Sequence, residues 1–257
     1  MALIAGLDLG RNADFSVLAV LDRQPRPEGE ATPKRRWRYT LRWLQSWDLG
    51  TPYPTICGGV ADRFGRRTDP ADTPLSWAPL AVDYTGVGTA VVDVLKAARP
   101  KARIEPVLIT SGHQVQKIDI PAGRAEHHVP KKELVSNLMA LLQGGLLRWT
   151  TAGAKGALPL VNRFEKELQD FREYVTRAKN QTFGAEASQK DDMVLAVMLA
   201  AWLGENTGGG DVGGIGLPHA GAGSMLERAP SGTFASDVGF HRDADRGSVG
   251  DRWGKER

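Results

Sequence analysis

The sequence predicts an α/β protein in which a mixed β-sheet is covered by helices on both faces. Three apolar runs of strand length come first and are joined by polar segments, and this succession predicts antiparallel strands. After them, strand-like runs alternate with runs of helical periodicity, which is typical of parallel strands joined by helices. The 257 residues are enough for one large domain or two small ones.

The first three strands are predicted at residues 3–9, 15–22 and 37–47. Turn residues at 11–14 make the first two strands a hairpin. The third run alternates in character, and one of its faces carries Trp37, Tyr39, Leu41 and Trp43. The other face is partly basic and carries Arg38, Thr40, Arg42 and Leu44.

Later runs complete the sheet and supply its helices. Strands at 77–83 and 104–110 give a five-stranded sheet, with three antiparallel strands followed by parallel ones, and residues 146–149 form a further short strand. Helices are predicted at residues 55–67, 86–98, 130–143, 160–178 and 191–203.

The domain organisation follows from a change in composition near residue 206. Residues 1–205 are expected to form the folded domain. Of the 52 residues from 206 to 257, thirteen are glycine, and the hydrophobic periodicity is lost, so we expect a disordered tail. The net charge of +3 permits a polyanionic partner without demanding one.

Several classes of protein are excluded or disfavoured. The single cysteine, Cys57, rules out an internal disulfide and a cysteine-rich zinc site, and it favours a reducing, cytosolic setting. The apolar N-terminus lacks a basic lead and meets Asp8 at once, so it predicts a strand and not a signal peptide. No apolar run has transmembrane length, and no phosphate-binding loop of the P-loop ATPases is present.

Four aspartates stand at the ends of apolar elements. Asp8 ends the first predicted strand and Asp83 ends the fourth. Asp191 and Asp192 begin the most apolar predicted helix, where two charges are costly if they are buried without partners. Strand ends of an open α/β sheet meet at one edge, and a helix N-terminus can lie beside them, so we expect these carboxylates to converge.

Each site also has an ordinary structural explanation. Asp8 can be a turn residue that accepts a hydrogen bond from its own backbone. Asp83 precedes a Thr-Gly-x-Gly segment and can be an N-cap or Asx-turn residue. The helix dipole favours acids in the first turn, which explains one of Asp191 and Asp192 better than it explains both.

A cluster of such carboxylates suits divalent metal ions. Carboxylates held close together repel, and bound Mg²⁺ or Mn²⁺ removes that conflict because both ions prefer oxygen ligands. Two ions about 3.5–4 Å apart can activate water and stabilise the leaving oxygen in phosphodiester hydrolysis. Asp14, in the loop after Asp8, is an accessory candidate whose alternative role is that of a turn residue.

Basic residues are candidates for contacts with DNA phosphates. They are Arg11, Arg35, Arg36, Arg38, Arg42, Lys131 and Lys132. A solvated surface is the alternative explanation for each of them. His113, His127 and His128 lie in polar segments without metal-ligand spacing, and we expect them to be surface loop residues.

Four motifs together resemble the nuclease domain of the large terminase subunit of tailed phages. In chain order they are Gly6-Leu7-Asp8-Leu9-Gly10 with Asp14, Val82-Asp83-Tyr84-Thr85-Gly86-Val87-Gly88, Val129-Pro130-Lys131-Lys132-Glu133-Leu134 and Lys190-Asp191-Asp192-Met193-Val194-Leu195-Ala196. Their order and spacing match over residues 3–203. The second and fourth motifs are moderately specific, and the first alone is weak.

The resemblance implies a ribonuclease H-like fold and a metal-dependent endonuclease that cuts concatemeric phage DNA during genome packaging. It implies that Asp8, Asp83, Asp191 and Asp192 hold two Mg²⁺ or Mn²⁺ ions and are catalytic. The implied partners are double-stranded DNA and a packaging ATPase, small terminase subunit or portal in the host cytoplasm, with no membrane.

The chain departs from the family in three respects. It starts at the nuclease, whereas large terminase subunits carry an N-terminal ATPase. Lys190 stands where the family often has histidine, and the basic loop at 25–38 has no counterpart.

Two other functions are compatible with the motifs. The Gly-x-Asp-x-Gly and Asp-x-Thr-Gly-x-Gly motifs also resemble those of actin-like ATPases and small-molecule kinases, although their matching helix is typically glycine-rich at its start. A non-catalytic DNA-packaging module with a weakened metal site is the other alternative.

Overall fold

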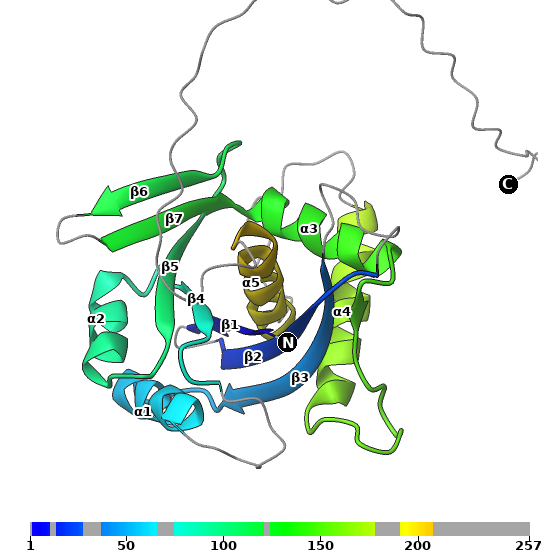
Figure 1. The fold of residues 1–257 in the computed structure, drawn as a ribbon, viewed down its shortest axis with the longest axis horizontal. Coiled ribbons are helices and arrows are strands. Elements are labelled where there is room, and N and C mark those ends of the chain that lie inside the picture. Colours follow the sequence, from blue (N-terminus) through cyan, green and yellow to red (C-terminus); the bar gives the residue numbers. More distant parts are fainter. Residues whose placement is uncertain are drawn as a thin grey trace, which may run out of the picture. The chain divides into compact units, whose positions relative to one another are not determined.

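The computed structural model describes residues 2–10, 14–27, 37–65, 75–120, 124–177 and 191–207 (Figure 1). Within these ranges one eight-stranded sheet has the order β6-β7-β5-β4-β1-β2-β3-β8. The strands are β1 (Ala2–Asp8), β2 (Ser16–Pro25), β3 (Trp37–Trp47), β4 (Pro79–Asp83), β5 (Arg103–Thr110), β6 (Gln116–Ile120), β7 (Arg124–Pro130) and β8 (Leu147–Arg148).

The five predicted main strands form the centre of this sheet. Strand β2 pairs antiparallel with both β1 and β3, whereas β4 pairs parallel with both β1 and β5. The central order β5-β4-β1-β2-β3, with these directions, is that of a ribonuclease H-like fold, so the predicted fold class is confirmed.

The sheet is larger than the five strands predicted. The short strand expected at 146–149 is β8, which pairs parallel with β3. Strands β6 and β7 form a hairpin beside β5, and the sequence analysis missed both. Residues 116–119 of β6 are all exposed, so they lack the apolar alternation that marks a half-buried strand.

Helices cover both faces of the sheet, as predicted. Helices α1 (Tyr53–Gly65) and α2 (Thr89–Ala97) pack with one hydrophobic cluster. Helices α3 (Lys131–Gln143), α4 (Val161–Arg177) and α5 (Asp192–Asn206) pack with the other. Figure 1 shows α5 lying over the central strands, between the sheet and the outer helices α3 and α4.

Helix α5 is the centre of the larger hydrophobic cluster. Twelve of its fifteen residues are buried, which explains why its sequence is apolar on all sides. The helix can approach β1 closely because the strand carries glycine at the crossing. A Cβ added to Gly6 would overlap the carbonyl oxygen of Ala196 and would lie 2.7 Å from the backbone nitrogen of Ala200.

The predicted faces of β3 are wrong because the strand contains a β-bulge. Val20 pairs with Trp43 and Leu21 pairs with Leu41, so Arg42 is the extra residue on the bulged strand. The extra residue reverses the alternation. Trp43 therefore packs against the α1–α2 cluster, whereas Leu44 joins Tyr39 and Leu41 in the α5 cluster.

The histidine pair was also wrongly placed by the sequence analysis. His127 and His128 lie in β7 and not in a surface loop, and both are half-buried. The His127 ring makes an edge contact with Trp202 of α5, with 5.3 Å between ring centroids, and its Nε2 lies 3.0 Å from an oxygen of Glu105. His113 is exposed between β5 and β6, as expected.

Residues 208–257 lie outside the described part of the chain, so the tail stays a prediction. Among the helices of the described ranges, none combines the length and the apolar character needed to cross a membrane.

Replacement of Gly6 by alanine is expected to destabilise the fold. The new methyl group would collide with the α5 backbone, and overpacking of this kind costs about 1–3 kcal/mol. Gly58→Ala is the matched control, since a Cβ there meets nothing within 4 Å and alanine favours the interior of α1 by roughly 0.5–1 kcal/mol. Urea unfolding measures both changes. A Gly6→Ala variant as stable as the wild type would contradict the proposed close contact.

Candidate functional site

The first two aspartates are neighbours because of the strand register. Strands β1 and β4 are parallel, and Asp8 is directly opposite Asp83. Leu7 and Val82 precede them and belong to the α1–α2 cluster, so the alternation of a strand turns both aspartates to the α5 face. Asp8 is only 7% exposed and Asp83 only 6%.

Helix α5 brings the other two aspartates to the same place. Asp192 is its first residue and is buried, while Asp191 precedes it as the N-cap and is half-exposed. Asp8, Asp83, Asp191 and Asp192 line one pocket, together with Asp14 from the loop between β1 and β2. The structure therefore brings together all five acids that the sequence singled out.

Asp8 and Asp83 are in an unfavourable environment for a charge. Burial raises the pKa of Asp8 well above its usual value, and repulsion from Asp83, Asp192, Asp191 and Asp14 raises it further. The Asp8 carboxylate has no hydrogen bond or ion pair with any described residue. Burial also raises the pKa of Asp83, although hydrogen bonds from Thr85 and the charge of Lys131 partly oppose this.

Asp83 has the turn contact that its sequence context suggested. Its Oδ1 accepts a hydrogen bond of 2.7 Å from the backbone N–H of Thr85. The Thr85 hydroxyl oxygen in turn accepts one of 2.7 Å from the N–H of Ile109, which lies near the end of β5 and lines the pocket. The Asx-turn explanation is thus satisfied, and the same contact fixes the Asp83 carboxylate at the pocket.

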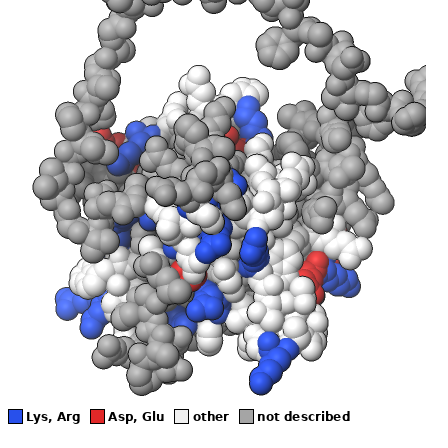
Figure 2. Space-filling view, turned by 45° about the vertical axis from the view of Figure 1, so that its right-hand side comes forward, with Lys and Arg blue, Asp and Glu red and all other residues white. Residues whose placement is uncertain are grey.

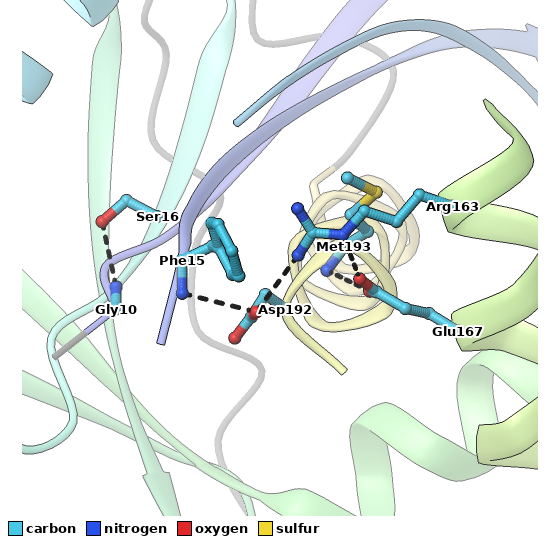
Figure 3. Close-up of polar contacts among 7 residues, drawn as sticks. All are labelled: Gly10, Phe15, Ser16, Arg163, Glu167, Asp192 and Met193. Carbon is cyan, nitrogen blue, oxygen red and sulfur yellow. Dashed lines mark hydrogen bonds and ion pairs between the residues drawn. The ribbon is translucent and has the colours of Figure 1, made fainter. Parts of the chain in front are cut away.

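One carboxylate oxygen of Asp192 makes a long hydrogen bond and a long ion pair (Figure 3). Its Oδ2 accepts a hydrogen bond of 3.4 Å from the N–H of Phe15 and lies 3.6 Å from Nη2 of Arg163. No contact to Oδ1 is found within the described residues. Burial raises the pKa of Asp192 to about 6, with repulsion from Glu167 as the next cause.

Asp191 has a different partner. Its Oδ2 lies 3.4 Å from Nζ of Lys131, the first residue of α3. Lys131 is the one basic residue that lines the pocket within the described ranges. Its position beside the acids was not apparent from the sequence, which indicated only a basic pair.

The donor set suits a hard divalent cation. Five carboxylates line the pocket, and the buried Asp8 carboxylate has no described partner to offset its charge. Such oxygen donors are the ligands that Mg²⁺ and Mn²⁺ prefer. As the side chains lie, however, no three acidic, histidine or cysteine groups in the described residues are arranged to hold one ion. Binding would therefore require the carboxylates to move closer together.

The other predicted DNA-contacting residues are more scattered. Arg11, Arg35 and Arg36 lie outside the described residues. Arg38 pairs with Gln24 near one end of β2. Asp8 pairs with Val17 at the other end of the same strand. Arg42 is exposed at the bulge, and Lys132 contacts His113. Among the described residues visible in Figure 2, the Lys and Arg side chains lie at several separate places on that face.

Arg163 and Glu167 on α4 are near the site but were not predicted from the sequence. Their spacing of four residues indicates an ion pair on one side of a helix, which is the only signal that the sequence offers. Their contacts with Asp192 and Met193 join residues that are far apart in the chain, and no local pattern predicts such contacts.

Comparison with known proteins gives similarity at the level of structure. No family model and no curated protein matches the sequence. The large terminase nuclease from thermophilic phage G20c with bound zinc is 19% identical, with a TM-score of 0.44, over 77% of this chain and 79% of that one. The Mn-soaked human cytomegalovirus terminase nuclease domain is 13% identical, with a TM-score of 0.46, over 79% of this chain and 82% of that one.

The fold is similar to that of terminase nuclease domains.

Removal of the Asp8 charge is expected to stabilise the metal-free protein. Because the folded state raises the pKa of Asp8, it binds that proton more tightly than the unfolded state does, and its stability falls as the pH rises above the unfolded value near 3.8. In the presence of EDTA at pH 8, Asp8→Asn should melt roughly 3 °C or more above the wild type. The difference should shrink towards pH 4.

Asp48→Asn is the control for this measurement, because Asp48 is exposed. Scanning calorimetry across the pH range gives the melting temperatures. Equal melting temperatures of Asp8→Asn and wild type at pH 8 would contradict an unfavourable charge at Asp8.

Proposed function

We propose that this chain is a metal-dependent endonuclease that hydrolyses DNA phosphodiester bonds, with two Mg²⁺ or Mn²⁺ ions held by Asp8, Asp83, Asp191 and Asp192. The observation that carries the proposal is the buried Asp8 carboxylate, in register with Asp83 and beside the start of α5, with no described partner for its charge. A buried charge without a partner does not stabilise the fold, so the arrangement is explained by a ligand that offsets the charge.

The chain's own residues bring the acids for this chemistry to one pocket. Two bound divalent ions lower the pKa of a water and stabilise charge on the leaving oxygen of a phosphodiester. Asp8 and Asp83 project from paired central strands, which fixes the separation of their backbones and leaves their side chains able to turn towards an ion. Asp192 is held through Oδ2, which leaves its Oδ1 to serve as a ligand. Asp191 is more accessible, and Asp14 is an accessory acid at the same pocket.

Lys131 is the described residue best placed to hold the DNA backbone. Its ammonium group lies in the acidic pocket and its side chain is 42% exposed, so it can contact a phosphate next to the reacting one. Lys132 follows it, and Arg11, Arg35, Arg36, Arg38 and Arg42 stay predictions as further phosphate contacts. Such contacts carry no base information, and cleavage should therefore show little sequence preference.

The sequence motifs support a setting in phage genome packaging. There the substrate would be concatemeric double-stranded DNA in the bacterial cytoplasm, and the partners would be a packaging ATPase, a small terminase subunit or a portal. These assignments rest on the resemblance of the four motifs.

A non-catalytic packaging module is the second candidate. The observation in its favour is that no described group of three ligands is pre-arranged for an ion. The two candidates differ in metal binding, since the nuclease must bind Mn²⁺ and the module need not.

Loss of a single site carboxylate should abolish DNA cleavage. Asp83→Asn keeps an oxygen that can accept the Thr85 N–H bond but removes the charge, and we expect plasmid cleavage in Mg²⁺ or Mn²⁺ to fall more than ~100-fold, because removal of a direct ligand should exceed the loss typical of outer-shell residues. Asp192→Asn should behave similarly. Exposed Asp48→Asn is the control. Equal cutting by all four proteins would refute the site. Absence of cutting and of Mn²⁺ binding in the wild type would favour the non-catalytic module.

Lys131→Met should weaken DNA binding and reduce its dependence on salt. Loss of one phosphate contact lowers the slope of log affinity against log salt by about 0.9 for duplex DNA. Fluorescence anisotropy with a duplex, in the Asp83→Asn background to prevent cleavage, measures the slope. Lys101→Met is the matched control. Lys101 comes just before the start of β5, whereas Asp83 is at the edge of the sheet where the parallel strands β4 and β5 end. An unchanged slope for Lys131→Met would exclude this contact.

A further inference from the structure

Two residues of α4 reach the start of α5 (Figure 3). Arg163 and Glu167 lie one helical turn apart, with 2.9 Å between Nε of Arg163 and Oε1 of Glu167. The other carboxylate oxygen, Oε2, accepts a hydrogen bond of 2.9 Å from the backbone N–H of Met193. Glu167 thus satisfies one of the free N–H groups in the first turn of α5.

Arg163 connects this pair to Asp192. Its Nη2 lies 3.6 Å from Oδ2 of Asp192, the same oxygen that accepts the Phe15 N–H. Its guanidinium carbon also lies 4.1 Å from the centre of the Phe15 ring. One arginine therefore contacts α4, α5 and the segment between β1 and β2.

The cap of α5 comes from another helix and not from its own N-cap residue. The Asp191 side chain makes no capping hydrogen bond. A neutral acceptor on α4 would be enough to bind the Met193 N–H. Instead α4 supplies a buried glutamate, which is 6% exposed and repels Asp192, together with the arginine that lies between the two carboxylates. Stability alone does not explain this choice, because buried ion pairs contribute little to it.

The contacts act on one side of the Asp192 carboxylate. Phe15 and Arg163 both meet Oδ2, and in Figure 3 the second oxygen points away from Arg163. We propose that Arg163 and Glu167 are positioning residues, which fix the first turn of α5 and the rotamer of Asp192 so that its Oδ1 is presented to a divalent cation in the pocket. This inference rests on the proposed function.

The experiment measures cation binding directly. Electron paramagnetic resonance of free Mn²⁺ gives the affinity of the full chain, and melting curves monitor its fold. The variants are Arg163→Met, Arg163→Lys and Glu167→Gln. Glu165→Gln is the matched control. Glu165 is also an α4 glutamate with a hydrogen bond, but it accepts that bond from Nε1 of Trp149, at 2.9 Å, and not from α5.

We expect Arg163→Met to bind Mn²⁺ about 10-fold more weakly than the control and to need a correspondingly higher Mn²⁺ concentration for half-maximal plasmid cleavage, as is typical for residues that orient a metal ligand. Arg163→Lys keeps the charge but not the planar fork, and its affinity should fall between the two. Glu167→Gln should also weaken binding, because it loses the ion pair that holds Arg163 in place.

Loss of a positive charge by itself would strengthen the binding of a cation. Arg163→Met that binds Mn²⁺ as tightly as Glu165→Gln, or more tightly, therefore overturns the inference. If Arg163→Met does not fold, the same comparison for Arg163→Lys and Glu167→Gln decides. A wild type that binds Mn²⁺ and cuts DNA, beside variants equal to the control, overturns the positioning role alone. A wild type that does neither overturns the proposed function and this inference with it.

Discussion

The structure depends on the close approach of α5 to β1 at Gly6. The backbone of Ala196 and Ala200 lies where any larger residue would place its Cβ. Four residues before Ala196 is Asp192, about 6 Å along the helix, and two residues after Gly6 is Asp8, about 6.6 Å along the strand. Both acids thus follow from the same crossing, at a short distance along their own elements. A glycine with no chemistry of its own determines where the acidic pocket forms.

The apolar core and the acidic pocket have opposite effects on the stability of the fold. Helix α5 buries twelve of its fifteen residues, and the hydrophobic effect holds it against the sheet. The same packing carries Asp192 out of water and raises its pKa, as the strand positions of Asp8 and Asp83 raise theirs. The core therefore forces acids into a place where they are unfavourable without a cation, and the fold tolerates this because the apolar contacts of α5 are extensive.

The sequence predicted the centre of the fold better than its edges. Apolar runs marked β1 to β5, and strand ends marked where Asp8 and Asp83 would meet, because both signals are local. The bulge at Arg42 turned Trp43 to the other face, and only pairing with β2 reveals it. Strands β6 and β7 lacked an apolar pattern. Arg163 and Glu167 act across the fold, and no periodicity in α4 distinguishes such a contact from a solvent-exposed ion pair.

The two adjacent acids of α5 are now distinct in role. Asp192 is buried and held by Phe15 and Arg163, while Asp191 is half-exposed and faces Lys131. Lys131 begins α3, so the N-termini of α3 and α5 both lie at the pocket, and the positive ends of their dipoles favour carboxylates there. These dipoles and the positive charges of Lys131 and Arg163 reduce the repulsion among the acids without cancelling it. The repulsion that remains is what a bound metal ion would offset as the carboxylates move closer together.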